Sequence, residues 1–219
     1  MQVVLDWDGT VTEVDTLRMV IERFGDLDVF HAAEEEIGRT LTLREVIALE
    51  MQTVRAPLGE VVDWLLAAVR VRPGFAELVE RRDPLIVSAG FCELIEPVLA
   101  RESVAARVVA NRIEAHLDGW VASFPRVPVC DVCGEHCKRS AVAGLGAFAY
   151  VGDGVSDRCV ALAAARVFAR SGLAAWLAEQ GVPYEPFEDF FDVAAGLDGS
   201  LPSDGGAVVP PRRSRGRNT

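Results

Sequence analysis

Residues 2–10 read QVVLDWDGT, an apolar run that ends in two aspartates, a glycine and a threonine. Side chains two positions apart on a strand point the same way, so Asp6 and Asp8 are expected to converge at the end of a buried strand. Paired carboxylates repel one another unless a cation neutralises them, and Mg2+ prefers such oxygen ligands. The stretch therefore predicts a Mg2+ site at the end of the first strand. An ordinary strand followed by an acidic turn is the alternative.

Short apolar runs and helical patterns alternate along much of the chain. The runs predict buried parallel strands, and the alternation predicts a doubly wound α/β sheet that binds ligands at the carboxyl ends of its strands. The predicted strands are residues 2–7, 84–90, 106–111, 147–154 and 165–170. The predicted helices are residues 75–82, 91–102, 140–145, 156–165 and 172–180.

Three segments depart from this alternation. Residues 13–72 contain only helical patterns, too many for one crossover, and predict a helical cap inserted into a core formed by residues 1–12 and 73–198. Residues 111–125 contain the pair Asp118–Gly119 between two alternating runs, which predicts a β-hairpin. Residues 199–219 are rich in Gly, Pro and Arg and predict a disordered tail.

The composition excludes several classes of function. The chain of 219 residues has a formal net charge of -11, and residues 1–204 hold 18 basic and 33 acidic residues, which argues against a nucleic-acid surface. No apolar run is long enough for a membrane span. The N-terminus lacks a signal-peptide pattern, and the five cysteines, an odd number, favour reduced thiols. We therefore expect a cytoplasmic protein without a membrane or nucleic-acid partner.

Two further polar motifs end predicted strands. Ser88, Ala89 and Gly90 precede a helical pattern, and a hydroxyl with free backbone N–H groups there would suit a phosphate. In GDGVSD, Asp153 and Asp157 form a second acidic cluster. A helix-capping serine and an acidic turn are the respective alternatives.

One lysine stands apart among the basic residues. Lys138 is the only lysine, whereas the other 21 basic residues are arginines. A compact ammonium differs from a planar guanidinium, and a pocket that holds carboxylates and a phosphate could require it. Chance retention of a surface lysine is the alternative. Together with the motifs at the strand ends, Lys138 indicates one phosphate site.

In this order, DWDGT, VSAG, Lys138 and GDGVSD resemble the four motifs of the haloacid dehalogenase (HAD) superfamily, over residues 2 to about 195. The helical insert between the first two motifs is similar to the cap of the subclass that includes phosphoserine phosphatase. The resemblance implies a HAD-like fold and a Mg2+-dependent phosphatase acting on a small phosphorylated metabolite.

The resemblance also implies a role for each matching residue. Asp6 would be the nucleophile that forms an aspartyl-phosphate, and Asp8 the general acid and base. The phosphate would be held by Thr10, Ser88, Ala89, Gly90 and Lys138, with Lys138 also counted as catalytic. Mg2+ would be bound by the Asp6 carboxylate, the Asp8 carbonyl and Asp153, with Asp157 supporting its water shell.

The substrate is expected to be selected by the cap. Asp15 and Arg44 are candidates for substrate contacts, and each could instead be a solvated helix charge. CGEHCKRS and the segment from Ala169 to Val193 resemble the methionine-salvage phosphatases that act on 2-hydroxy-3-keto-5-methylthiopentenyl-1-phosphate. Phosphoserine phosphatase and phosphocholine or phosphoethanolamine phosphatases are the alternatives, and a non-catalytic phosphate or metal sensor is the non-enzyme alternative.

Three cysteines and a histidine lie close together in the sequence. Cys130, Cys133, His136 and Cys137 form a C-x2-C-x2-H-C pattern, which could bind a structural Zn2+. Four ligands this close would strain a tetrahedral site, so buried or redox-active thiols are the favoured interpretation.

Overall fold

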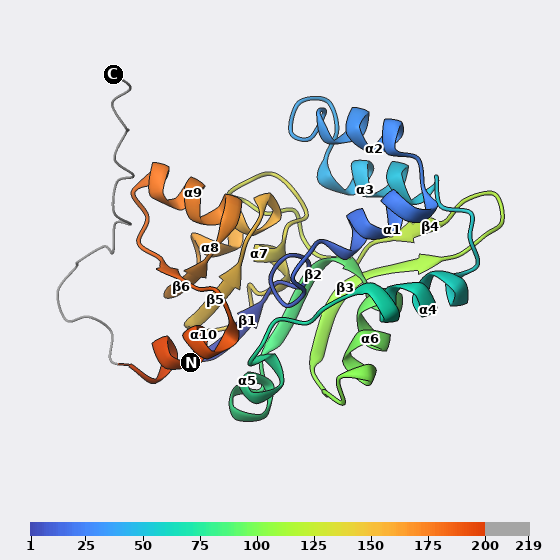
Figure 1. Ribbon diagram of the computed structural model, residues 1–219. Coiled ribbons are helices and arrows are strands. Elements are labelled where there is room, and N and C mark those ends of the chain that lie inside the picture. Colours follow the sequence, from blue (N-terminus) through green and yellow to red (C-terminus); the bar gives the residue numbers. More distant parts are fainter. Residues whose placement is uncertain (200–219) are drawn as a thin grey trace, which may run out of the picture.

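A computed structural model describes residues 1–199, and the expected tail falls almost wholly outside these described residues. The core is a seven-stranded sheet in the order β4-β3-β2-β1-β5-β6-β7, parallel except for the antiparallel pair β3–β4 (Figure 1). The predicted doubly wound α/β fold is confirmed. The strands are β1 (Gln2–Leu5), β2 (Leu85–Phe91), β3 (Arg107–Glu114), β4 (Val121–Ser123), β5 (Phe148–Gly152), β6 (Arg166–Ala169) and β7 (Glu185–Pro186).

Helices cover both faces of the sheet because the strands carry apolar side chains on both faces. Val3 and Leu5 belong to one core cluster, whereas Val4 between them belongs to a second cluster on the opposite face. The helices of the sheet domain are α5 (Phe75–Arg82), α6 (Cys92–Arg101), α7 (Lys138–Ala141), α8 (Arg158–Ala161), α9 (Ser171–Gln180) and α10 (Phe190–Asp198), with a 3-10 turn η1 (Val155–Asp157) before α8.

Of the five helices between β1 and β2 in the chain, four lie within the proposed cap of residues 13–72. They are α1 (Thr16–Phe24), α2 (Leu27–Glu34), α3 (Leu43–Met51) and α4 (Leu58–Ala68). An antiparallel bridge joins Thr12 to Val71 where the chain leaves the sheet and returns to it. Figure 1 shows α1, α2 and α3 gathered beyond one end of the sheet. The cap is thus connected to the sheet domain by two adjacent segments, which contain Thr12 and Val71.

The predicted hairpin is formed by β3 and β4, and it supports the cap. Trp120 is fully buried, and its indole Nε1 donates to the Ala56 carbonyl at 2.9 Å. Gly119 has a φ of 137°, and a Cβ there would lie 2.3 Å from the Gln52 carbonyl oxygen. A glycine is therefore required at this turn, because no side chain fits between hairpin and cap.

Some predicted elements differ from the structure. The helix expected over 156–165 is a 3-10 turn and one short helix, and the helix expected over 140–145 begins earlier, at Lys138. The short strand β7 and the helix α10 were not predicted from the pattern. No helix among residues 1–199 is long and apolar enough to cross a membrane.

Candidate active site

The carboxyl end of β1 carries the first aspartate into the site. Asp6 is 4% exposed, and its backbone N–H donates to the Val151 carbonyl of β5 at 2.9 Å. The loop that follows turns at Gly9, whose φ is 75°. A Cβ at Gly9 would lie 2.4 Å from Asp153 Oδ2, so only glycine lets the loop approach that carboxylate.

Lys138 lies at the centre of the site. Its ammonium bonds Asp6 Oδ1 and, at 2.6 Å, Asp157 Oδ1, and its side chain is 6% exposed. Burial lowers the pKa of Lys138, but the carboxylates of Asp157 and Asp6 outweigh it and hold that pKa above the ordinary value. Lys138 is therefore a cation, and it joins the start of α7 to Asp6 after β1 and to Asp157 of η1.

Asp157 is fully buried, and both of its oxygens are occupied. Oδ1 also accepts from the Tyr150 hydroxyl at 2.6 Å, and Oδ2 accepts from the backbone N–H groups of Asp153 and Gly154 at 2.9 Å each. Burial alone would raise the pKa of Asp157, but Lys138 and these donors lower it below the ordinary value. Asp157 is thus a positioning residue behind the carboxylates, and its expected support of the metal's water shell stays a prediction.

Three carboxylates gather around one ammonium. Single oxygens of Asp6, Asp153 and Asp157 all lie within 4.8 Å of one another. Burial, and then the charge of Asp157, hold the pKa of Asp6 well above its ordinary value despite Lys138. Burial and Asp157 likewise raise the pKa of Asp153. The uncompensated negative charge and the oxygen donors fit a hard divalent cation such as Mg2+.

Asp8 faces away from this cluster, toward the cap and β2. Its Oδ1 accepts from the backbone N–H of Thr16 at 2.9 Å and from the Thr16 hydroxyl, and Ser88 Oγ lies 3.4 Å from its Oδ2. Burial, followed by the charge of Asp15, raises the pKa of Asp8 to about 7, against these hydrogen bonds. A carboxyl group of this kind can both donate and accept a proton near neutral pH.

The predicted phosphate residues divide into two groups. Ser88, Ala89 and Gly90 line the cavity at the end of β2, and Gly90 N donates to Ser88 Oγ at 2.8 Å. Thr10 is buried instead, and its hydroxyl donates to Asp153 Oδ1 at 3.1 Å. The Thr10 side chain therefore orders the carboxylates and is not on the cavity wall, which differs from the expected phosphate contact.

A cavity of about 720 Å3 lies between the strand ends and the cap. Asp6, Asp8, Ser88, Lys138 and Asp153 line its base. The cap contributes apolar side chains from its helices and loops to the opposite wall, namely Val14, Leu17, Phe30, Ile37, Leu43 and Ile47. Charged side chains such as Asp15 and Glu50 lie beside these apolar ones on the cap wall. A pocket with a polar base and a partly apolar opposite wall suits a small ligand with a charged head.

The two predicted cap residues both reach this cavity. Asp15 caps α1 and accepts from Arg18 N at 2.9 Å. Arg44 donates to the Pro125 carbonyl at 3.1 Å, and its guanidinium lies 5.2 Å from the centre of the Phe124 ring. Substrate contacts by either residue stay predictions.

Several site residues were not predicted from sequence. Arg72 is 7% exposed and donates to the carbonyls of Thr10 and Gly9 at 3.0 Å each, so it fixes the loop after β1. Asn111 Nδ2 donates to the Ala89 carbonyl at 2.6 Å. Of these residues, only Tyr150 could have been noticed in the sequence, because its hydroxyl is a polar group within an otherwise apolar strand.

Glu50 of α3 is a buried carboxyl group on the cap side of the cavity. It is 3% exposed, and no donor among the described residues reaches its Oε1. Burial, and then the charges of Glu34 and Asp15, raise its pKa from 4.5 to about 8. The folded state therefore holds this proton more tightly than the unfolded chain does, so Glu50 lowers stability as the pH rises from 4.5 to about 8.

Glu50→Gln should therefore stabilise the protein most at alkaline pH, because the amide is neutral at every pH. Its Tm should exceed that of the wild type by several degrees at pH 8, and the difference should shrink toward pH 5. Calorimetry at both values measures this. Glu80→Gln, at an exposed position of α5, is the control and should shift Tm equally at both. A pH-independent effect of Glu50→Gln would show that Glu50 is ionised in the folded protein.

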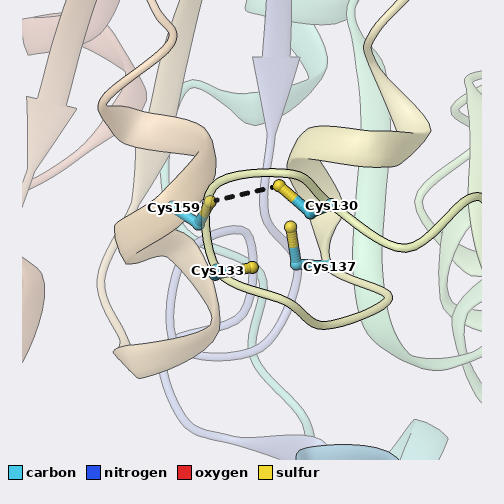
Figure 2. A group of neighbouring side chains, drawn as sticks. All are labelled: Cys130, Cys133, Cys137 and Cys159. Atoms are coloured by element: carbon cyan, nitrogen blue, oxygen red, sulfur yellow. Dashed lines mark hydrogen bonds between the residues drawn. The ribbon is translucent and has the colours of Figure 1, made fainter.

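The predicted cysteine cluster differs at one position. The Sγ atoms of Cys130, Cys133 and Cys137 lie together with that of Cys159, which follows η1 (Figure 2). His136 is outside the group, and its Nδ1 lies 2.7 Å from the Val127 carbonyl oxygen. The predicted cluster did not include Cys159, because this residue lies 22 residues beyond Cys137 in the chain.

The sequence of this chain matches the family model of the haloacid dehalogenase-like hydrolases over residues 3–162. It belongs to the HAD family. A 2-hydroxy-3-keto-5-methylthiopentenyl-1-phosphate phosphatase of Geobacillus kaustophilus is 30% identical and covers 88% of this chain and 93% of its own. One of the same name from Exiguobacterium sp. is 26% identical and covers 90% and 97%. Family and relatives together identify a phosphoric monoester hydrolase.

Solved structures of phosphoserine phosphatase share the fold. A substrate-bound complex superposes with a TM-score of 0.65 at 14% identity and covers 89% of this chain and 97% of that one. A phospho-aspartyl intermediate analogue gives 0.64 at 15% identity, with the same coverage. At these identities the likeness concerns the fold alone.

Proposed function

We propose that this protein is a Mg2+-dependent phosphatase that hydrolyses a small-metabolite phosphate monoester through an aspartyl-phosphate on Asp6. The observation that carries the proposal is the convergence of Asp6, Asp8, Ser88, Lys138 and Asp153 at the base of one cavity. Phosphoryl transfer needs little beyond positioning and charge stabilisation, and these residue types supply both.

In the first step, an oxygen of the Asp6 carboxylate attacks phosphorus, and the bond from phosphorus to the ester oxygen breaks. The carboxyl group of Asp8 gives its proton to the leaving oxygen. In the second step, water attacks the phosphorus and Asp8 takes a proton from it, which releases inorganic phosphate and restores Asp6. Two accessible steps replace one slow hydrolysis.

Lys138 and Mg2+ would offset the charge of nucleophile and substrate. The residues that would hold the ion are Asp6, Asp153 and the main-chain carbonyl of Asp8. Mg2+ supplies electrostatic stabilisation of the phosphoryl oxygens when bound. Lys138 holds the Asp6 carboxylate in place, and Ser88 with the backbone N–H groups of Ala89 and Gly90 would bind the phosphoryl oxygens.

For the substrate, we propose a 2-hydroxy-3-keto-5-methylthiopentenyl-1-phosphate-type ester of methionine salvage. Two observations support this choice. Relatives of that name match along nearly their whole length. The cap wall of the cavity is apolar at Leu17, Phe30 and Ile47, as an uncharged methylthio chain would require.

A second candidate is an ester that carries an amino group, such as phosphoserine or phosphoethanolamine. It is favoured by Asp15, Glu34 and Glu50, three acidic residues on the cap side of the same cavity. A cationic group would offset their mutual repulsion, which adds to the effect of burial in raising the pKa of Glu50.

The test is phosphate release from a panel of monoesters, with and without Mg2+. We expect Mg2+-dependent release, with kcat/KM highest for the methylthio ester. Preference for phosphoserine or phosphoethanolamine would instead establish the second candidate. No release from any ester, together with measured Mg2+ binding, would contradict the enzyme and favour the phosphate or metal sensor.

A further inference from the structure

A second cluster of reactive side chains lies beside the proposed active site. Cys130, Cys133 and Cys137 come from the loop before α7, and Cys159 comes from α8 (Figure 2). Their sulfur atoms all lie within 4.8 Å of one another, and Cys130 Sγ is 3.8 Å from Cys159 Sγ. All four are free thiols. Two distant parts of the chain thus present four sulfur ligands to one point.

We propose that these four cysteines bind one structural Zn2+ as a tetrahedral thiolate site. Four sulfurs each about 2.3 Å from a central Zn2+ lie about 3.8 Å from one another, which is the separation of Cys130 and Cys159. A disulfide would require about 2.05 Å. Four ligands from one short loop would strain a tetrahedral site. With Cys159 as the fourth ligand this strain does not arise, because Cys159 comes from another element.

The backbone of the loop is already folded as a ligand turn. Gly134 directly follows the C-x2-C pair, has a φ of 74° and donates from its N–H to the Cys130 carbonyl at 2.8 Å. The backbone N–H groups of Cys133 and Val132 face the Cys130 sulfur.

The loop has little else to hold it. Residues 125–136 contain no helix or strand, and Val129 and Val132 are 54% and 59% exposed. Cys130, at 5% exposed, is the only buried residue of this segment. A loop without an apolar core gains its order from a metal in many small folds.

The position of the cysteine site suggests that the metal would help to position active-site residues. Cys137 directly precedes Lys138, and Cys159 follows Asp157 by two residues. Lys138 and Asp157 form the 2.6 Å ion pair at the centre of the active site. Zn2+ would therefore join the loop that leads into Lys138 to α8, which directly follows Asp157, and the four cysteines are positioning residues for Lys138.

The experiment is zinc analysis of the full-length protein purified under reductant and without chelator. We expect about one Zn2+ per chain. Cys133→Ser and Cys159→Ser should each lose it, whereas Cys92→Ser, at a buried thiol of α6, and His136→Ala should keep it. Retention in His136→Ala separates the four-cysteine set from the set predicted by sequence. Asp6→Asn should also retain zinc, so the outcome is independent of the proposed phosphatase function.

Two further readouts accompany the zinc analysis, and the first does not depend on how well any variant folds. Wild-type protein loaded with Co2+ should show the thiolate charge-transfer and tetrahedral d–d bands of a sulfur site. Cys133→Ser should lower kcat by about tenfold or more with a smaller change in KM, because Lys138 is misplaced. Wild-type protein with less than about 0.1 Zn2+ per chain after incubation with Zn2+ and reductant would overturn the proposal. A disulfide between any of the four under those conditions would also overturn it.

Discussion

Asp6→Asn is expected to lower kcat/KM by at least about 10^4-fold, because it removes the nucleophile on which both chemical steps depend. The amide keeps the size of the carboxylate, and it relieves a buried group whose pKa is held above its ordinary value by burial and by Asp157. We therefore expect the variant to stay folded and its Tm to change little. Phosphate release at saturating Mg2+ gives the activity, and calorimetry gives the Tm.

The matched control is Asp63→Asn, the same change at an exposed position of α4. It should leave kcat/KM and Tm within error of the wild type. If Asp6→Asn were folded and kept more than about a tenth of the activity, Asp6 could not be the nucleophile.

Lys138→Arg is expected to lower kcat by about 10^2-fold or more although it preserves the charge. The ammonium fits between Asp6 and Asp157 in a site that leaves its side chain 6% exposed. A longer, planar guanidinium cannot occupy that space without displacing one of the two carboxylates, so the nucleophile loses its orientation. Steady-state kinetics with the preferred ester measures this.

Arg139→Lys is the control for that variant, since it makes the reverse change at the next residue, outside the cavity. Its kcat should match the wild type. Activity of Lys138→Arg within about threefold of the wild type would contradict the account, because charge alone would then suffice at this position.

The fold was largely predictable because the strands of a buried parallel sheet are continuous apolar runs. Consecutive apolar residues such as Val3, Val4 and Leu5 predict a strand that is buried on both faces. The helices with a clear apolar period, α5 and α6, were predicted to within a residue. β7 was not, since its two residues are Glu185 and Pro186 and only pairing with β6 defines them.

The site was predictable where one short stretch of sequence carries the chemistry. Asp6, Asp8 and Gly9 belong to such a stretch. Residues that act across long separations were not predictable. Arg72 fixes the loop after β1 from 62 residues away, and Cys159 joins Cys130 across 29. Their side chains have no local pattern, because their partners are set by the tertiary fold.

The position of Thr10 differs from its expected role for the same reason. Thr10 was assigned to the phosphate and Asp157 to the metal's water shell from their places in motifs, and both are fully buried. Their polar atoms instead bind other side chains and backbone N–H groups, which hold the carboxylates and Lys138 in register. A motif identifies which residues belong to a site but not which of them reach its surface.

Trapping of the covalent intermediate tests the central claim most directly. The wild-type protein would be mixed with a phosphate-labelled ester that it hydrolyses, quenched in acid within one turnover, and digested for peptide mapping. We predict labelled phosphate on the N-terminal peptide at Asp6, sensitive to hydroxylamine and absent from Asp6→Asn. Full phosphate release with no labelled protein at any time within the turnover, or label at a residue other than Asp6, would contradict the account.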